Sequence, residues 1–226
     1  MDWKRQCAVV IPCFNEAGRI VPVIEGVREH LPNIIVVDDG STDGTTRRAK
    51  AAGAEVIGQS RNGGKGCALR TGWGHARQLG FTWALTMDGD GQHAPDDTPI
   101  FFACAEKTNA SLVVGDRMGN ATAMPWLRRQ VNRWMSRRLS GRTGVRLPDS
   151  QCGFRLAHLE TVARLSLVAR RFEIESEILL AFLAAGECVE FVPIQVIYGP
   201  GPSKICPVLD TWRWMRWWSA QLPAAS

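Results

Sequence analysis

The sequence predicts an α/β protein, a three-layer α/β/α sandwich with a mostly parallel central sheet. Short apolar runs alternate along the chain with segments whose apolar residues recur at helical spacing, and this alternation is typical of such sheets. Polar clusters directly follow several of the apolar runs, as expected where parallel strands end at a binding edge. The 226 residues fit one domain with a full hydrophobic core, and no linker marks off a second one. We therefore expect a single domain over residues 1–226.

The predicted elements alternate between strands and helices over the first half of the chain. Buried strands are expected at residues 8–11, 34–37, 55–57, 81–87, 111–114 and 189–197. Helices are expected at residues 20–31, 45–52, 65–79, 96–107 and 173–185. After Gly115 a basic amphipathic helix and a loop around residues 149–155 interrupt the alternation.

Basic residues are concentrated in one stretch of the chain. There are 27 Lys and Arg against 22 Asp and Glu, a formal net charge of +5. Seven arginines and no acid lie from Arg128 to Arg146. Such a stretch indicates an anionic partner, and nucleic acid, anionic lipid headgroups and a phosphorylated acceptor all qualify. A solvated helix face is the structural alternative.

Cysteine usage and hydropathy bear on the compartment. The seven cysteines are scattered and form no C-x-x-C pair, which argues against a zinc or redox site. Scattered thiols and a polar N-terminus without a secretory leader favour a reducing compartment. No apolar stretch reaches the roughly 18 residues of a membrane-spanning helix. We expect a cytoplasmic protein.

The most informative segment is Asp88–His93, with the sequence DGDGQH, directly after a predicted strand. Two carboxylates at positions i and i+2, separated by glycine, can face one hard cation, and Mg²⁺ and Mn²⁺ prefer such oxygen ligands. The amide oxygen of Gln92 is a third candidate ligand, whereas we expect His93 not to be one. An Asp-Gly turn without a metal is the structural alternative.

Two adjacent acids, Asp38 and Asp39, end another predicted strand and lead into a helix. A helix cap does not need both acids, so one carboxylate is available for a ribose hydroxyl or a base N–H, and we assign that role to Asp39. The later segment Asn62–Gly66 fails the spacing of a P-loop. Its glycines let the backbone pass close to a ligand, with Lys65 near a phosphate or an acid. A purely structural loop is the alternative.

Three further charged residues are candidates for the site. Arg117 follows a predicted strand, and its planar guanidinium suits phosphate. Lys204 follows a Gly/Pro-rich stretch of the kind that forms mobile lids, where it would neutralise a diphosphate leaving group. Glu175 lies in the first turn of a predicted helix, where an acid favours the helix dipole, and its functional interpretation is a catalytic base.

Taken together and in this order, these segments resemble the family-two glycosyltransferases of the GT-A fold. They are most similar to the dolichol-phosphate mannose synthase branch and its bacterial polyprenyl-phosphate relatives. The matching segments are Ile11–Glu16, Val37–Thr45, Asn62–Gly66, Met87–His93, Gly115–Arg117, Cys152–Arg155 and Ser203–Lys204. The resemblance runs from about Val9 to Lys204, and seven motifs in order are specific to the family.

The resemblance implies a role for each matching residue. The nucleotide sugar would be bound by Pro12, Phe14, Glu16, Val37, Asp39, Lys65, Met87 and Lys204. Mg²⁺ or Mn²⁺ would be held by Asp88, Asp90 and Gln92. The catalytic residues would be Asp90, Arg117 at the acceptor phosphate, and Glu175.

One position departs from the family pattern. The mannose synthases carry an arginine six residues before the late lysine, and here that position is Tyr198. Phosphate clamping would then rest on Lys204 and Arg117 alone, or on an arginine of the basic helix.

The expected activity is inverting, metal-dependent transfer of a hexose from a nucleotide sugar to a polyprenyl phosphate. A lipid phosphate is already an anion near neutral pH and needs no strong base, whereas a sugar hydroxyl needs one, and Glu175 is the first candidate. GDP- and UDP-sugars both stay open. The alternatives are transfer to a saccharide hydroxyl, a sugar-phosphate nucleotidyltransferase and a non-catalytic nucleotide-sugar binding module. No nucleic-acid partner is expected.

Residues 124–146 and 208–226 are expected to form helices at a membrane interface. The first segment has an apolar stripe at helical spacing beside its arginines, formed by Leu127, Val131, Trp134, Met135 and Leu139. The second is rich in tryptophan and arginine, which favour the interface. Helices packed on the core, or a homodimer contact, are the alternatives. We expect peripheral association with the inner face of a membrane.

Overall fold

The structure is a computed structural model that describes residues 1–119, 124–197 and 207–221. Seven strands form one sheet in the order β3-β2-β1-β4-β6-β5-β7. The strands are β1 (Cys7–Cys13), β2 (Ile34–Asp38), β3 (Glu55–Gly58), β4 (Trp83–Thr86), β5 (Leu112–Asp116), β6 (Arg155–His158) and β7 (Val189–Pro193). Only β6 runs antiparallel to its neighbours within this sheet, so the prediction of a mostly parallel sheet is confirmed.

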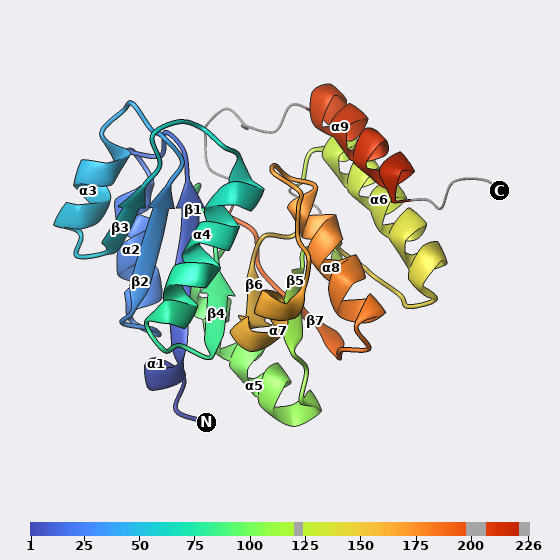
Figure 1. Ribbon diagram of the computed structural model, residues 1–226, viewed down its shortest axis with the longest axis horizontal. Coiled ribbons are helices and arrows are strands. Elements are labelled where there is room, and N and C mark those ends of the chain that lie inside the picture. Colours follow the sequence, from blue (N-terminus) through green and yellow to red (C-terminus); the bar gives the residue numbers. More distant parts are fainter. Residues whose placement is uncertain (120–123, 198–206, 222–226) are drawn as a thin grey trace.

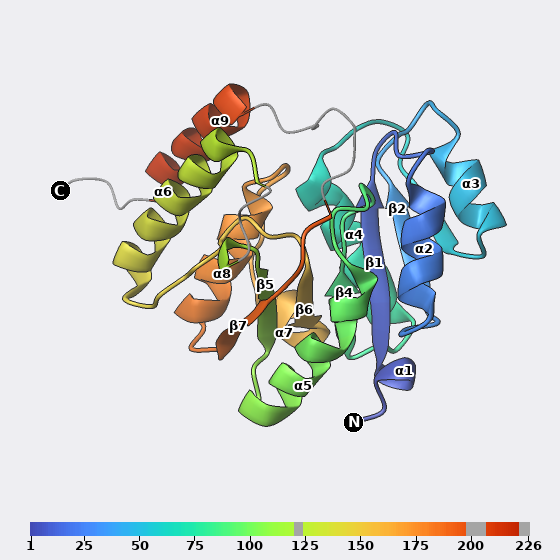
Figure 2. The ribbon, with the colours of Figure 1, turned by 180° about the vertical axis from the view of Figure 1, so that it is seen from behind.

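Helices cover both faces of the sheet, which gives the predicted three layers (Figures 1 and 2). One face carries α4 (Lys65–Gln78), α7 (Leu159–Arg164) and α8 (Ile174–Ala184). The other carries α2 (Ile20–Arg28) and α5 (Thr98–Thr108), which follows the short 3₁₀ helix η1 (Pro95–Asp97). The remaining helices are α1 (Trp3–Gln6), α3 (Thr45–Ala51), α6 (Trp126–Thr143) and α9 (Pro207–Ala220).

The hydrophobic core lies on both faces of the sheet, where α4 and α8 pack on one side and α2 and α5 on the other. β1 and β2 are buried at every position, because both of their faces are covered. Gly72 makes the close packing of α4 possible, since an added Cβ would lie 2.4 Å from Cγ1 of Val10 and 3.0 Å from Cγ2 of Val37. Gly72 lowers the helix propensity of α4, but its lack of a side chain lets this helix pack closely on the sheet.

The described elements differ from the predicted ones mainly after residue 115. The loop expected around 149–155 ends in β6, a strand of four residues that the sequence did not reveal, and α7 follows it directly. The strand expected at 189–197 ends at Pro193. Short strands of mixed polarity lack the apolar run or strict alternation on which such predictions depend.

The helices α6 and α9 lie side by side at the end of the molecule away from α3 (Figures 1 and 2). A small core of their own, formed by Met135, Leu139, Leu147 and Trp214, joins them. The apolar stripe expected on α6 therefore divides: Met135 and Leu139 are buried, whereas Leu127 and Trp134 are exposed. Among the described residues, no helix is both long and apolar enough to cross a membrane.

Candidate active site

The candidate site lies at one edge of the sheet, beyond the carboxyl ends of β1, β2 and β4. These strands are parallel neighbours, so the polar segments that follow them meet there. The first two segments are tied together by hydrogen bonds: the backbone N–H of Asn15 donates to Oγ of Ser41 at 2.8 Å, and that of Glu16 donates to Oγ1 of Thr45 at 2.8 Å. These hydrogen bonds fix the relative positions of the two segments without a bound ligand.

Asp39 binds the glycine-containing segment Asn62–Gly66 to this edge through hydrogen bonds. Its two carboxylate oxygens accept hydrogen bonds from the backbone N–H groups of Gly63, at 2.7 Å, and Gly64, at 2.8 Å. Gly64 has a φ of +96°, and an added Cβ would lie 2.5 Å from the carbonyl oxygen of Arg170, so only glycine fits. The role of Asp39 toward a nucleoside stays a prediction, and the structure adds this loop-holding contact to it.

The other residues expected to bind the nucleotide sugar surround the same edge. Pro12 and Val37 are register partners on β1 and β2, and both are buried. Met87 is buried directly after β4, and Phe14 is partly exposed after β1. Glu16 is 6% exposed, and its Oε2 accepts from Arg19 at 3.3 Å. All five are on or beside the three parallel strands; their binding roles stay predictions.

A chain of four alternating charges runs through the centre of the site. The ammonium of Lys65 lies 2.5 Å from Oδ1 of Asp88 and 2.7 Å from Oε1 of Glu175. The other carboxylate oxygen of Glu175 lies 2.9 Å from Nε of Arg155. Lys65 begins α4, Asp88 follows β4, Arg155 begins β6 and Glu175 lies in the first turn of α8. The chain therefore joins the two halves of the sheet.

The charges of this chain set the acidity of its members. Burial would raise the pKa of Asp88, but the charge and hydrogen bond of Lys65, together with the charges of His93 and Arg117, outweigh it and lower that pKa to about 2. Burial would lower the pKa of Lys65, but Asp88 and Glu175 outweigh it, and the pKa is raised. Burial raises the pKa of Asp90, and the nearby charge of Asp88 raises it further. The pKa of His93 falls to about 4 because this ring is buried.

The residues at this turn fit a hard divalent cation that is shared with a phosphate ligand. Asp88 and Asp90 are close enough for one charge to raise the pKa of the other, and a cation between them would relieve that repulsion. The described residues contain no group of three or more His, Cys, Asp or Glu that could hold a metal. A pair of carboxylates completed by substrate phosphates is how Mg²⁺ is usually held.

The two remaining candidate ligands are engaged with protein groups. Oε1 of Gln92 accepts a hydrogen bond from Arg128 of α6 at 3.3 Å. Nδ1 of His93 accepts from the backbone N–H of Asp88 at 3.3 Å, which supports leaving this histidine out of the ligand set. Gln92 stays a predicted ligand that would have to release Arg128.

A second charged cluster lies beside the first, where β5 ends. Arg117 makes a two-pronged ion pair with Asp149, with Nε at 2.7 Å from Oδ2 and Nη2 at 2.9 Å from Oδ1. Nδ2 of Asn132 on α6 also donates to Oδ1 of Asp149, at 2.8 Å. Burial would raise the pKa of Asp149, but the charge of Arg117 and the hydrogen bonds from Arg117 and Asn132 together outweigh it and lower that pKa. Arg117 was expected at the acceptor phosphate; this pairing engages two of its nitrogens, and the role stays a prediction.

Three functional positions escaped the reasoning from sequence. Arg155 and Asp149 carry the ion pairs of the two clusters, and Gly153 lets Lys65 and Asp88 meet, since a Cβ there would lie 2.5 Å from Nζ and 2.6 Å from Oδ2. The segment Cys152–Arg155 was matched as a motif without a role for its members. Because β6 is antiparallel, it begins where β4 and β5 end, and this puts its first residue in the site.

The late lysine of the resemblance, Lys204, and the departing position Tyr198 lie outside the described residues. Their expected roles stay predictions.

Comparison with known proteins gives consistent relatives. The family model described as Glycosyl transferase family 2 matches residues 8–166. The chain is 32% identical over 213 residues to the UDP-N-acetylglucosamine–dolichyl-phosphate N-acetylglucosaminyltransferase of Methanococcus voltae, covering 84% of this chain and 85% of that protein. It is 34% identical to glycosyltransferase AglJ of Haloferax volcanii, covering 89% of this chain and 66% of that one. The dodecaprenyl-phosphate galacturonate synthase of Rhizobium johnstonii is 31% identical, with 72% of this chain and 51% of the relative covered.

Among solved structures, glucosyl-3-phosphoglycerate synthase from Mycobacterium tuberculosis has a similar fold. The complex of that enzyme with Mn²⁺, uridine diphosphate and phosphoglyceric acid superposes with a TM-score of 0.75 over 97% of this chain and 80% of the other, at 20% identity. A likeness at this level of identity concerns the fold, and it confirms the GT-A type architecture.

Proposed function

The chain belongs to glycosyltransferase family 2, and from this premise we propose that it transfers a sugar from a nucleotide sugar to a polyprenyl phosphate. The observation that carries the proposal is the site at the carboxyl edge of β4, where Asp88 lies beside Asp90 and ends a chain of alternating charges that contains Lys65 and Arg155. Relatives that share more than two thirds of this chain are named for transfer to dolichyl or dodecaprenyl phosphate, which supports the choice of acceptor.

The chemistry is a single in-line displacement that inverts the anomeric carbon. An oxygen of the acceptor phosphate forms the new bond to that carbon, while the bond to the nucleoside diphosphate breaks and its electron pair leaves with the diphosphate. Asp88 and Asp90 would hold Mg²⁺ or Mn²⁺, which would supply positive charge next to the leaving diphosphate. Lys65, 2.5 Å from Asp88, adds a second positive charge at the same place.

The environment of Glu175 favours a phosphate acceptor over a hydroxyl. Its two oxygens are paired with Lys65 at 2.7 Å and Arg155 at 2.9 Å, and the side chain is 4% exposed. Both oxygens are engaged by cations, so neither is free to receive the proton of an acceptor hydroxyl. A phosphate nucleophile carries no proton that has to be removed, so Glu175 serves to position Lys65 and Arg155.

A transfer assay tests this proposal with two acceptors that differ in one group. Radiolabelled UDP-sugars and GDP-sugars are each incubated with the full chain, Mg²⁺ or Mn²⁺, and either a polyprenyl phosphate or the free polyprenol of the same length. We expect label in the organic phase with the phosphate alone. Equal transfer to the free alcohol, or no transfer from any nucleotide sugar, would contradict the proposal.

A matched pair of variants ties the activity to the site. Asp90→Asn removes one proposed metal ligand, whereas Asp96→Asn makes the same change at a carboxylate that is 91% exposed. We expect the first variant to lose transfer by on the order of 100-fold or more and the second to keep it.

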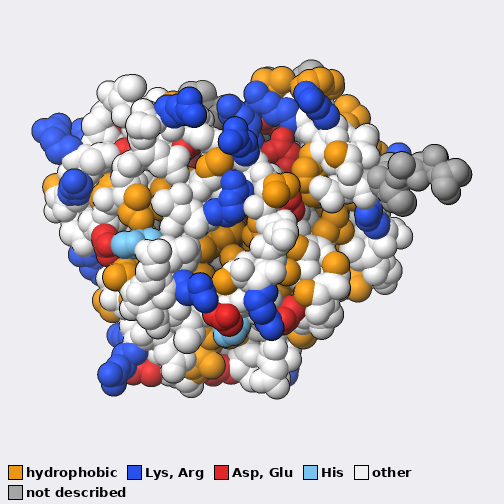
Figure 3. Space-filling model, viewed as in Figure 1, with side chains coloured by type: hydrophobic (Ala, Val, Ile, Leu, Met, Phe, Trp, Pro, Cys, Tyr) orange, Lys and Arg blue, Asp and Glu red, His pale blue; other side chains and the backbone are white. Residues whose placement is uncertain are grey.

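We further propose that α6 and α9 attach the enzyme to the membrane that holds its lipid acceptor. Large apolar side chains are exposed along both helices, at Trp126, Leu127, Trp134, Leu209, Trp212 and Met215. Figure 3 shows basic and hydrophobic side chains next to one another over α9. The guanidinium of Arg216 stacks on Trp212, and that of Arg138 on Trp134. Paired tryptophan and arginine side chains are typical of membrane interfaces.

Flotation with vesicles that contain anionic lipid tests the attachment. Trp212→Ala removes an exposed ring from α9, and Leu79→Ala removes an equally exposed apolar side chain at the end of α4 as the control. We expect the first change to reduce the bound fraction several-fold and the second to leave it unchanged. A protein that stays wholly in solution would argue for helices that merely pack on the core.

A further inference from the structure

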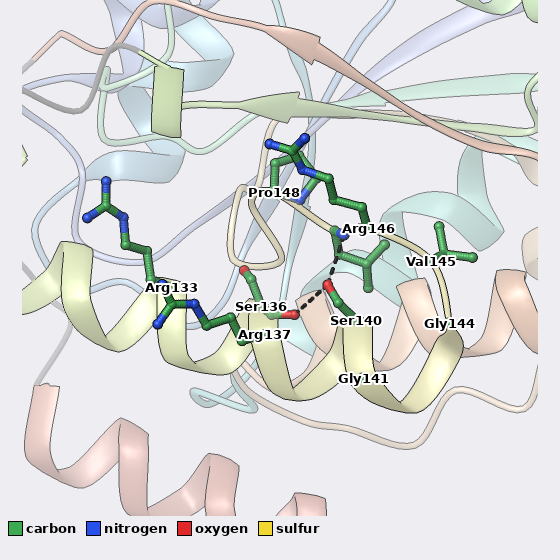
Figure 4. Close-up of a pocket in the computed structure, with 10 residues that line it drawn as sticks. Arg133, Ser136, Arg137, Ser140, Gly141, Gly144, Val145, Arg146 and Pro148 are labelled. Atoms are coloured by element: carbon green, nitrogen blue, oxygen red, sulfur yellow. Dashed lines mark hydrogen bonds between the residues drawn. The ribbon is translucent and has the colours of Figure 1, made fainter.

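A separate pocket lies between the second half of α6 and the segment 144–148 that follows it (Figure 4). Its volume is about 560 Å³, within the range of roughly 300–1,000 Å³ that is usual for small-molecule sites. The lining residues are Arg133, Ser136, Arg137, Ser140, Gly141, Gly144, Val145, Arg146, Leu147 and Pro148. None of the residues assigned above to the nucleotide sugar or to the metal lines it.

The pocket carries an excess of positive charge. It is lined by three arginines and by no acid. Within the described residues, Arg133, Arg137 and Arg146 form no salt bridge, and the charge of Arg146 is one of several that act to lower the pKa of Asp116, which burial raises. In contrast, Arg117, Arg155 and Arg213 each form a salt bridge with an acid. Two other arginines of α6 are used differently, since Arg138 stacks on Trp134 and Arg142 on Trp218. The helix therefore has one set of arginines packed on tryptophans and another that surrounds a cavity.

The floor of the pocket is held in place by hydrogen bonds. Oγ of Ser140 donates to the carbonyl oxygen of Ser136 at 2.8 Å and accepts from the backbone N–H of Leu147 at 2.9 Å, which ties the segment 144–148 to the helix (Figure 4). Gly141 lines the pocket, and a Cβ there would meet no atom within 4 Å, so the position has room for a larger side chain. The hydrogen-bonding groups of Ser140 are therefore satisfied within the protein, and the arginine side chains are the groups that would bind a ligand.

We propose that this pocket binds a phosphomonoester group, as a second anion site beyond the transfer reaction. A phosphomonoester offers three acceptor oxygens and a charge of about −1.5 to −2, which matches three guanidinium groups better than a singly charged diester does. Arginine presents two parallel donors to phosphate, and three arginines from two segments can approach from different sides. The group belongs either to a lipid headgroup or to a small phosphorylated molecule.

The pocket also has a direct connection to the acceptor side of the site. Oγ of Ser136 donates to Oγ of Ser150 at 3.0 Å, and Asp149 between Pro148 and Ser150 holds Arg117. An occupied pocket would thus stiffen the segment that holds Arg117. This connection does not enter the binding test, which can succeed or fail whatever reaction the enzyme performs.

The first test measures binding of inorganic phosphate to the full chain by calorimetry, with a chelator present so that no metal contributes at Asp88. The triple variant R133Q/R137Q/R146Q removes the three pocket charges. The control R47Q/R48Q/K50Q removes three exposed charges from α3, so both proteins lose the same net charge. We expect the pocket variant to bind phosphate at least about tenfold more weakly than wild type, and the control to bind within about twofold of it.

A second variant fills the cavity without changing its charge. Gly141→Leu introduces a side chain where an added Cβ meets open space, and leucine favours the helix more than glycine does. We expect phosphate binding to fall about tenfold while the melting temperature stays the same or rises. If phosphate binds Gly141→Leu as it binds wild type, the cavity is not the site.

Vesicles distinguish the two sources of the phosphate group. Wild type and the triple variant are sedimented with vesicles of phosphatidic acid, which exposes a monoester, and with vesicles of phosphatidylglycerol, which exposes a diester, at equal surface charge. A lipid source predicts a preference for phosphatidic acid that the triple variant loses. A small-molecule source predicts no preference among vesicles together with the calorimetric difference. Equal losses in the pocket variant and the α3 control, or no phosphate binding by wild type, would overturn the proposal.

Discussion

Two charge clusters lie at the same edge of the sheet and differ in their exposure. In the first, the side chains of Lys65 and Asp88 are 11% and 28% exposed, whereas those of Arg155 and Glu175 are 2% and 4% exposed. In the second, the side chains of Arg117 and Asp149 are 6% and 0% exposed, and Asn132 donates a further hydrogen bond to Asp149. The comparison teaches that similar ion pairs serve different purposes: the pair of Lys65 and Asp88 can exchange a partner for a ligand, and the pair of Arg117 and Asp149 ties the end of β5 to the segment between α6 and β6.

The largest expected effect on stability comes from the fully buried cluster of Arg117 and Asp149. Asp149→Ala leaves the guanidinium of Arg117 buried without its carboxylate, and breaking a buried pair in this way costs about 3–5 kcal/mol. We expect the free energy of unfolding in urea to fall by that amount. The control is Glu160→Ala, which breaks an exposed pair with Arg77 and should cost at most about 1 kcal/mol. Equal losses in the two variants would mean that Asp149 is not a structural anchor.

At the more exposed cluster around Lys65 and Asp88, we expect the loss of a charge to lower activity rather than stability. Asp90→Asn is expected to lower transfer by on the order of 100-fold without lowering the free energy of unfolding at pH 7. The reason is that burial and Asp88 raise the pKa of Asp90, so its ionised form is disfavoured in the folded protein. A large loss of stability in this variant would show that both clusters are structural.

A matched pair of glycine substitutions probes the contact between Lys65 and Asp88. In Gly153→Ala the added Cβ would lie 2.5 Å from Nζ of Lys65, so the lysine has to move, and we expect transfer to fall about tenfold. In Gly74→Ala the added Cβ meets nothing within 4 Å, and the helix should gain about 0.5–1 kcal/mol. Initial rates and urea unfolding of both variants check the pair. Unchanged transfer in Gly153→Ala would show that the contact between Lys65 and Asp88 is not needed for activity.

The smallest expected effect is a change in the free energy of unfolding that occurs only at acidic pH. The pKa of Asp149 lies below its ordinary value of 3.8 in the folded protein, so the folded state binds fewer protons than the unfolded state around that pH. The stabilisation is therefore complete above pH 3.8 and is lost as the pH falls through the lowered value. Asp149→Asn has no such titration, and its deficit in unfolding free energy relative to wild type should shrink below pH 3.8. A deficit that is constant down to pH 2 would contradict this linkage.

The first half of the fold was predictable from sequence because its strands are parallel and fully buried. β1, β2 and β4 appear as apolar runs, each followed by the polar residues of the edge, and the rule for parallel sheets brings these residues together. Asp39, Asp88 and Asp90 could therefore be assigned to one edge before any geometry was known. Their proximity required only the order of the strands.

The second half could not be predicted in the same way. β6 is short and antiparallel, so Arg155 enters the site from a strand that has no clear apolar signature. The partner of Arg117, Asp149, lies 32 positions later in a loop, and no spacing rule connects such residues. The stripe on α6 was correctly recognised as apolar, but which of its residues would be buried depended on Trp214 of α9.

The central claim is that Asp88 and Asp90 bind a divalent cation together with the diphosphate of a nucleotide sugar. The most direct measurement is the calorimetric affinity for UDP-sugars and GDP-sugars with and without Mn²⁺, in wild type and in Asp90→Asn. The account predicts that Mn²⁺ tightens binding of one of these ligands by about tenfold or more in wild type and leaves the variant unaffected. Equal affinities with and without Mn²⁺ in wild type would contradict it.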